Sequence, residues 1–295
     1  MPASIGIEAR RAAGWPALAL LLNAFVWGIS WWPFRWLQGQ GLQPLWATVL
    51  IYALAVVVIS LLHPQAWREL FGTPVLWLLV LASGTTNASF NWGVTVGDVV
   101  RVVLLFYLMP MWAALLARPL LGERFTRRAA ARTLMAMAGA AIVLWPPGGG
   151  WPLPRTLAEW LGVLGGMTFA LNNVMLRREA ARGSGARALA MFLGGALVSG
   201  LSALVLTALG RVPAPPPLAL PWIAGALAMG GCFLAGNMAL QFAAARLPSS
   251  VTAVVMITEV LFASVSAVLL GAGVVTPSLM LGGALILGAT LWSAI

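Results

Sequence analysis

Residues 99–128 read VVRVVLLFYLMPMWAALLARPLLGERFTRR, a long apolar run that ends in a cluster of arginines. An α-helix needs about 20 apolar residues to cross the hydrocarbon core of a bilayer, which is about 30 Å thick. Arginines directly after such a run mark the cytoplasmic end of a span, because cytoplasmic loops carry an excess of cations. The segment therefore predicts a transmembrane helix that ends in the cytoplasm.

The composition of the whole chain agrees with this interpretation. Of its 295 residues, 61% are hydrophobic and 8% are charged, whereas a soluble domain carries about 25% charged residues. This excludes an ordinary soluble globular protein, a disordered tail and a fibrous repeat. Ten apolar runs separated by turn residues are expected to span the membrane, within the limits 15–37, 44–62, 73–96, 99–120, 129–146, 157–177, 187–209, 219–244, 248–271 and 275–294.

The arginines predict the orientation. With the N-terminus in the cytoplasm, thirteen of the 17 cations fall in cytoplasmic segments, and only Arg35, Arg101, Arg155 and Arg211 fall outside. Ten spans return the C-terminus to the cytoplasm, so we expect a multi-pass protein of the cell inner membrane. The net charge of +10 does not indicate a nucleic-acid partner, because the cations lie in short clusters between apolar runs.

Missing residue types exclude several chemistries. All cations are arginine, and without a lysine the chain can form neither the Walker A phosphate loop of an ATPase nor a Schiff base. The single cysteine, Cys232, and the single histidine, His63, cannot build a His/Cys zinc cage or a Cys–His dyad. We therefore expect no metal, no cofactor and no catalytic residue. A membrane-embedded enzyme stays a weak alternative, because the loops are too short to build a soluble active site.

The two halves of the sequence are similar to each other. Leu120-Leu121-Gly122 matches Leu269-Leu270-Gly271 at an offset of 149 residues, and Gly139 matches Gly288 at the same offset. Asn87 and Asn91 align with Asn237 and Gln241 at an offset of 150, and Trp27, Ser30 and Trp31 align with Phe169, Asn172 and Asn173 at 142. The chain therefore divides into a first half, 1–147, and a second half, 148–295.

Five spans in each half are an odd number, so the halves enter the membrane in opposite directions. The charges agree with this inversion. Glu123 and Arg124 follow the first Leu-Leu-Gly, whereas the second is followed by the uncharged Ala272 and Gly273. Inverted repeats of this kind are common in secondary transporters.

The segment from Leu108-Met109-Pro110 to Leu120-Leu121-Gly122-Glu123-Arg124 resembles the first-repeat signature of the EamA branch of the drug/metabolite transporter superfamily. The second half departs from it, with Glu259 at the position of Pro110. The resemblance implies an all-α polytopic membrane protein with ten transmembrane helices, arranged as two inverted five-helix repeats around a central cavity. It also implies a secondary transporter that works by alternating access.

Within this branch, the Trp-rich first span is similar to that of bacterial exporters of aromatic and other amino acids. The expected function is therefore export of aromatic and other hydrophobic amino acids across the inner membrane. Export of other small metabolites or drugs of the superfamily is the main alternative. A nucleotide sugar is disfavoured, because no predicted span has an arginine or lysine at its centre. A monomer in the bilayer fits these features, and the sequence leaves the oligomeric state open.

Glu259 is the strongest candidate for the transport site. It lies near the middle of the predicted span 248–271, where inserting a carboxylate costs about 3 kcal/mol. Such a group must face the protein interior, be paired or carry a proton. We therefore expect it to contact a substrate ammonium group or to couple transport to protons; the alternative is a structural hydrogen bond to a neighbouring helix.

Amides and aromatic side chains within the predicted spans are the other candidates. Amides can hydrogen-bond both ends of a zwitterion, and aromatic rings can pack against an apolar side chain. The alternative interpretation is hydrogen bonding and packing between helices, with about 0.6 kcal/mol for each hydrogen bond. The candidates are Asn87, Asn91, Asn172, Asn173, Asn237, Gln241, Trp27, Trp31, Ser30 and Tyr107.

Three local features carry structural expectations. Pro110 is expected to kink its span, because proline removes a backbone hydrogen bond. Gly162 and Gly166 form a GxxxG pattern that favours close helix packing. Asp98 and Arg101 lie three residues apart near the external end of their span, where we expect them to be solvated at the interface; the alternative is that they pair with each other at the mouth of the cavity.

Overall fold

The computed structural model describes residues 3–122, 127–145, 153–244, 256, 258–272 and 274–292. Every regular element in these ranges is a helix. The helices are α1 (Ala3–Ile29), α2 (Trp31–Gly39), α3 (Pro44–Leu62), α4 (Gln65–Gly72), α5 (Val75–Val96), α6 (Val99–Phe106), α7 (Met109–Leu121), α8 (Arg127–Leu144), α9 (Leu157–Arg178), α10 (Ser184–Ala208), α11 (Leu220–Ala244), α13 (Thr258–Leu269) and α14 (Pro277–Trp292).

The predicted apolar runs lie on helices, and two of the runs are broken. Helix α3 has the predicted limits 44–62, and α9 begins at the predicted residue 157. The run 15–37 is divided between α1 and α2 at Ser30, and the run 99–120 is divided between α6 and α7. The break before α7 lies where the proline was expected to kink the helix, because Pro110 occupies an N-terminal position of α7, where its missing N–H is not needed.

Four helical segments of the described residues are long and apolar enough to cross a membrane: 15–39, 44–62, 184–208 and 220–243. Two bent pairs raise the number to as many as six. Helices α4 and α5 meet at 104°, and a 40° bend lies within residues 101–121. The structure therefore supports a polytopic membrane protein. The count of ten spans and the repeat boundary at 147 stay predictions, and residues 146–152 lie outside the described ranges.

Local signals explain where several helices begin. The Gln43 side chain accepts a hydrogen bond from the Leu45 N–H at 2.7 Å, and Pro44 supplies a favourable first residue for α3. Thr156 and Glu159 form a capping box at the start of α9. Asp98 caps α6 by accepting the Arg101 N–H at 2.8 Å. These caps satisfy backbone donors that a helix leaves free in its first turn.

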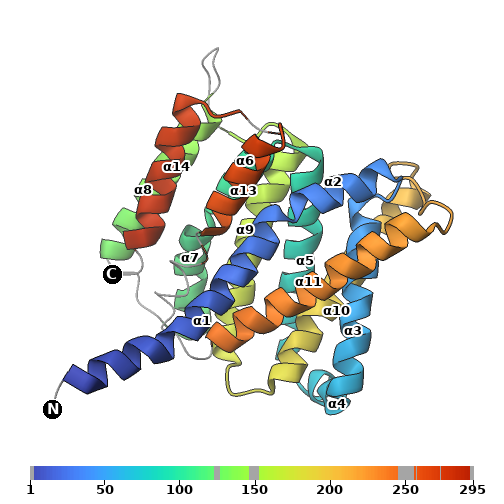
Figure 1. Ribbon diagram of the computed structural model, residues 1–295, viewed down its shortest axis with the longest axis horizontal. Coiled ribbons are helices and arrows are strands. Elements are labelled where there is room, and N and C mark those ends of the chain that lie inside the picture. Colours follow the sequence, from blue (N-terminus) through green and yellow to red (C-terminus); the bar gives the residue numbers. More distant parts are fainter. Residues whose placement is uncertain are drawn as a thin grey trace.

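The helices form a bundle in which the two halves of the chain interleave (Figure 1). Helix α5 of the first half packs on α9 and α10 of the second half, and α1 packs on α11 and α13. Helix α3 packs on α10 and α11, and α8 and α14 lie side by side at one edge of the bundle. The largest buried cluster joins α2, α3, α5, α10 and α11.

Glycines bring several helix backbones into direct contact. A Cβ atom on Gly194 of α10 would collide with the Val80 carbonyl oxygen of α5, and one on Gly84 would collide with the Gly194 carbonyl. The predicted GxxxG contact is confirmed: a Cβ on Gly162 would lie 2.8 Å from the Val102 carbonyl oxygen, and one on Gly166 would collide with the Phe106 carbonyl. These crossings hold the helices that surround the central cavity.

Two pairs of glycines that align between the halves have matching surroundings. Gly122 ends α7 with φ 71°, and Gly271 follows α13 with φ 69°, a left-handed conformation that glycine adopts at little cost. Gly139 of α8 contacts α14, where its Cβ would lie 2.6 Å from the Gly282 carbonyl oxygen. Gly288 of α14 contacts α8, where its Cβ would lie 2.6 Å from Met135 Cε.

Candidate functional site

A central cavity of about 610 Å³, including its opening, lies between helices of both halves. Its lining combines aromatic rings, amides, hydroxyl groups and one carboxylate. The lining residues are Asn23, Trp27, Tyr52, Ser83, Thr86, Asn87, Phe90, Phe106, Phe169, Asn172, Met191, Phe192, Phe233, Asn237, Leu240, Met256 and Glu259.

Aromatic rings form a connected wall of this cavity. The Trp27 ring lies edge-on to Phe233 at 4.7 Å and to Phe90 at 5.8 Å between centroids. Phe106 continues the wall, 4.9 Å from Phe90 and 5.2 Å from Phe169. Rings packed edge to face or tilted in this way present an apolar surface of ring faces and ring edges to a bound molecule. The sequence predicted the contribution of Trp27.

Glu259 lines the cavity and is 4% exposed. It lies in the first turn of the described helix α13, and residues 245–255 before it are outside the described ranges. Tyr107 lies between α6 and α7. Its hydroxyl group lies 3.2 Å from Glu259 Oε2 and 2.8 Å from the Met256 carbonyl oxygen. Tyr107 therefore positions the Glu259 carboxyl group through a hydrogen bond and does not itself line the cavity.

Two of the cavity amides already have protein partners. Asn87 Nδ2 donates to the Ser83 carbonyl oxygen at 2.7 Å, and Asn87 Oδ1 accepts from the Tyr52 hydroxyl. Asn237 Oδ1 accepts from Gln241 Nε2 at 2.8 Å. The hydrogen bonds of Asn87 tie α3 to α5, whereas Asn237 and Gln241 pair along α11.

Two other cavity amides carry polar atoms without a protein partner. Both Nδ2 and Oδ1 of Asn172 are buried and unpaired. Asn23 Nδ2 donates to the Gly236 carbonyl oxygen at 2.8 Å, which leaves Asn23 Oδ1 buried and unpaired. Leaving a buried polar atom without a partner costs about 1–3 kcal/mol. These atoms are therefore the ones in the cavity that a bound molecule can satisfy.

Comparison with known proteins finds a family that is similar to the first half of the chain. Residues 14–145 match the EamA-like transporter family. The matched region is slightly less than half of the chain, and within it the match supports the predicted resemblance to the EamA-like transporters of the drug/metabolite transporter superfamily. This family consists of polytopic membrane proteins that transport small metabolites.

No curated protein matches the chain. One solved structure, titled "Crystal structure of protein", is similar to this chain. The similar region covers 94% of this chain and 95% of the chain in that structure. Its TM-score is 0.61 and its sequence identity is 17%. At this identity the likeness concerns the fold alone. It shows that the fold extends beyond the EamA-like region into the second half of the chain.

Six of the predicted candidates do not line the cavity. Asn91 Nδ2 donates to Thr48 Oγ1 at 3.0 Å, and the Trp31 indole donates to Ser266 Oγ at 2.9 Å. Ser30 Oγ donates to the Trp27 carbonyl at 2.7 Å. These contacts join helices or cap a helix end. The candidates outside the lining are Asn91, Trp31, Ser30, Tyr107, Asn173 and Gln241.

Of the two candidate tryptophans, Trp27 on α1 lines the cavity, whereas Trp31 on α2 lies in a buried cluster and does not. The sequence interpretation also missed Asn23, Tyr52, Ser83 and Thr86. Asn23 had a usable signal, since it is an amide within an apolar run. The hydroxyl residues had none, because serine and threonine are common in membrane helices.

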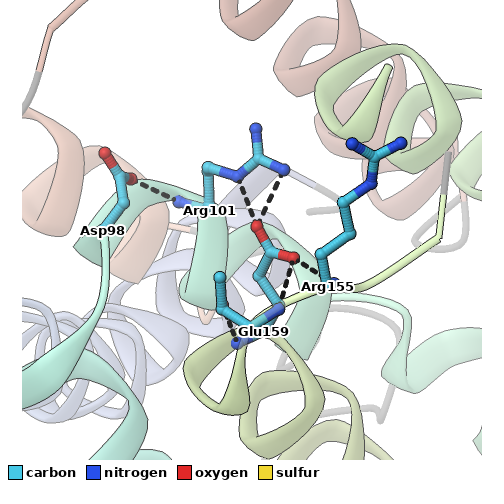
Figure 2. A network of polar contacts seen from close by, with 5 residues as sticks. Asp98, Arg101, Arg155 and Glu159 are labelled. Atoms are coloured by element: carbon cyan, nitrogen blue, oxygen red, sulfur yellow. Dashed lines mark hydrogen bonds and ion pairs between the residues drawn. The ribbon is translucent and has the colours of Figure 1, made fainter. Parts of the chain in front are cut away.

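An ionic network joins α6 to the start of α9 (Figure 2). Glu159 is 7% exposed, and its Oε1 accepts from Arg101 Nη2 at 2.8 Å and from Arg101 Nε at 2.9 Å. Its Oε2 accepts from the Arg155 backbone N–H at 2.7 Å. Asp98 is exposed, as expected, whereas Arg101 is 35% exposed and also pairs with Glu159, a partner 58 residues away that the sequence interpretation overlooked.

Replacing Glu159 by alanine is expected to lower the stability of the purified protein by about 2–4 kcal/mol. The variant loses the capping box and leaves Arg101 without this carboxylate. Thermal unfolding in detergent measures the effect. Thr156→Ala removes only the other half of the capping box and is expected to cost about 1 kcal/mol; equal losses in the two variants would show that the ion pair contributes nothing.

No three His, Cys, Asp or Glu side chains gather into a possible metal site within the described residues. Within the described part of the cavity lining, Glu259 alone has a carboxyl group, and no residue is arginine, lysine or histidine. General acid–base chemistry on a substrate commonly uses two such groups at one site. The cavity is therefore equipped to bind a small amphipathic molecule.

Proposed function

We propose that the chain is a secondary transporter that exports aromatic and other hydrophobic amino acids across the inner membrane by alternating access. The observation that carries this proposal is the central cavity, which joins an aromatic wall to a carboxylate and two incompletely paired amides. An amino acid has the matching parts, since its side chain packs on rings and its ammonium group donates to oxygen atoms.

The packing of the helices supports two inverted five-helix repeats. If α1, α3, α5, α7 and α8 correspond to α9, α10, α11, α13 and α14, each contact that these helices make between the halves has a counterpart. The contact α5–α9 corresponds to α11–α1, α10–α5 to α3–α11, and α7–α9 to α13–α1. The correspondence exchanges α3 with α10 and α8 with α14, so each of these two contacts is its own counterpart. A pseudo-twofold axis between the halves produces this pattern.

Alternating access requires that the halves move relative to each other around a shared site. Both halves line the cavity, from Asn23 to Phe106 in the first and from Phe169 to Glu259 in the second. Polar contacts also join the halves away from the cavity, at Arg101–Glu159 and where Glu69 Oε1 accepts the Gly183 N–H at 3.0 Å. A change of access would separate one of these contacts while the other holds.

The proposed orientation places both termini in the cytoplasm, and the thirteen arginines on that side support it. The alternative function is export of another small metabolite or drug by the same mechanism. The cavity favours amino acids over a nucleotide sugar, because its lining offers no cation to a diphosphate. A monomer in the bilayer is sufficient for this mechanism, since one chain forms the cavity.

Uptake into liposomes that contain the purified protein tests the proposal. We expect labelled phenylalanine, tryptophan and leucine to enter faster than aspartate and faster than they enter protein-free liposomes. A pH gradient across the membrane separates proton exchange from facilitated movement. Failure of every amino acid, with uptake of a cationic drug, would overturn the proposed cargo.

A further inference from the structure

The free hydrogen-bonding groups of the cavity are mostly acceptors. Once the protein partners are assigned, the unpaired amide atoms in the lining are Asn23 Oδ1, Asn172 Oδ1 and Asn172 Nδ2. The Glu259 carboxyl group adds oxygen atoms to this set. Among these buried groups the acceptors, which are two amide oxygens and a carboxyl group, outnumber the one amide donor, so they suit a molecule that donates more hydrogen bonds than it accepts.

The orientation of Asn23 is set by the protein. Its Nδ2 donates to the Gly236 carbonyl oxygen at 2.8 Å, so turning the amide over would place its oxygen against another oxygen. Asn23 is 0% exposed and Asn172 is 1% exposed. Neither acceptor can reach bulk water, and each can gain a partner only from a molecule inside the cavity.

The formal charges of the lining residues also favour a cargo that donates hydrogen bonds. Among the lining residues that the structure describes, one has a carboxyl group and none is arginine, lysine or histidine. A carboxylate of the cargo would lose its hydration and gain no cation in return, which is unfavourable in a buried site. An ammonium group carries three donors and would meet acceptors of both kinds, two amide oxygens and a carboxylate.

Resting on the proposed function, we propose that the cavity selects its cargo through an ammonium group held by Asn23, Asn172 and Glu259, and does not require the cargo's carboxylate. The substrate class is therefore aromatic primary amines, including amino-acid amides as well as free amino acids. The aromatic wall of Trp27, Phe90, Phe106, Phe169 and Phe233 receives the apolar part of the cargo.

Four phenyl compounds separate the contributions of the two ends of an amino acid. Their binding to the purified protein is measured by calorimetry in detergent. Phenylalaninamide and 2-phenylethylamine are expected to bind at least as tightly as phenylalanine. 3-Phenylpropionate, which lacks the ammonium group, is expected to bind at least tenfold more weakly. Equal binding of 3-phenylpropionate and phenylalanine, or binding of phenylalanine without 2-phenylethylamine, would overturn the proposal.

Asn172→Leu tests the amide directly. We expect it to weaken binding of 2-phenylethylamine about tenfold or more, as the loss of a hydrogen bond to a charged group does. The melting temperature without ligand should stay unchanged or rise, because the substitution removes an unpaired buried amide. Asn173→Leu is the matched control: it changes the neighbouring amide, which lies outside the cavity lining, and should leave binding unchanged.

A structural role for Asn172 predicts the opposite pattern, with a lower melting temperature and unchanged binding, and this result would refute the proposal. If the variant does not fold, the four-compound comparison on the unmodified protein still decides. Transport of phenylalanine without binding of 2-phenylethylamine would refute only this inference. Failure to bind or transport any compound of either panel would refute the proposed function itself.

Discussion

Glu259→Gln is expected to reduce the initial rate of amino-acid uptake into liposomes about 100-fold. Glu259 is the one carboxyl group among the lining residues of the cavity. Glutamine keeps the shape and an oxygen that can accept from the Tyr107 hydroxyl, but it removes the charge that would meet the cargo's ammonium group. Losing a hydrogen bond between two charged groups in a buried site costs up to about 3 kcal/mol, which corresponds to this factor.

The matched control is Glu179→Gln, which makes the same chemical change at a carboxylate outside the cavity, where it pairs with Arg182 at 3.3 Å. We expect its uptake rate to equal that of the unmodified protein. If transport exchanges protons through Glu259, the response of uptake to a pH gradient should also disappear in Glu259→Gln. Unimpaired uptake by Glu259→Gln over a range of pH would dismiss the functional role of this residue.

Gly194→Ala is expected to have the largest effect on stability, about 3 kcal/mol or more, with little folded protein recovered. The added Cβ would collide with the Val80 carbonyl oxygen of α5. A backbone atom cannot turn aside as a side chain can, so α5 and α10 would have to separate. Recovery of monodisperse protein after detergent extraction and its melting temperature measure this effect.

Gly200→Ala on the same helix α10 is the control. Its new Cβ would meet only Val49 Cγ2, at 3.4 Å, and alanine favours a helix more than glycine does. We expect this variant to be as stable as the unmodified protein or slightly more stable. Equal stability of Gly194→Ala and Gly200→Ala would show that the two backbones are not in contact in the folded protein.

The helices with uniform apolar sequence were the easiest to predict. Residues 44–62 form α3 with the expected limits, because Gln43, Pro44 and His63-Pro64 mark both of its ends. Helix α4 was not predicted, since eight residues are too few to resemble a span. The break at Ser30 also gave no signal, because serine fits within a helix and its effect depends on the neighbouring helices.

The candidate site was predictable in its residue types and only partly in its residues. An amide in an apolar run is conspicuous, and Asn87, Asn172 and Asn237 do line the cavity. Whether an amide is free or occupied depends on a partner far away in the chain. Asn91 is paired by Thr48 across 43 residues, and no spacing rule within one helix shows such a partner.

The hydrogen bonds of the first half fall into two groups by the time at which their partners are synthesised. Asn87 with Tyr52, and Asn91 with Thr48, can pair as soon as α5 has entered the membrane. Asn23 and the Trp31 indole can pair only after Gly236 and Ser266 have been synthesised, and these partners lie more than 200 residues later in the chain. Until then these groups lie in lipid without the partners of the finished protein.

Biogenesis of this protein therefore includes an interval in which the first half is inserted but not complete. Arg101 and Tyr107 acquire Glu159 and Glu259 only when the second half follows. A chain that stops after the first five predicted spans would expose unsatisfied polar groups to the bilayer, where insertion and quality-control factors can bind them. Because helices of both halves pack together around the cavity, the first half can complete its hydrogen bonds and ion pairs only when the second half is present.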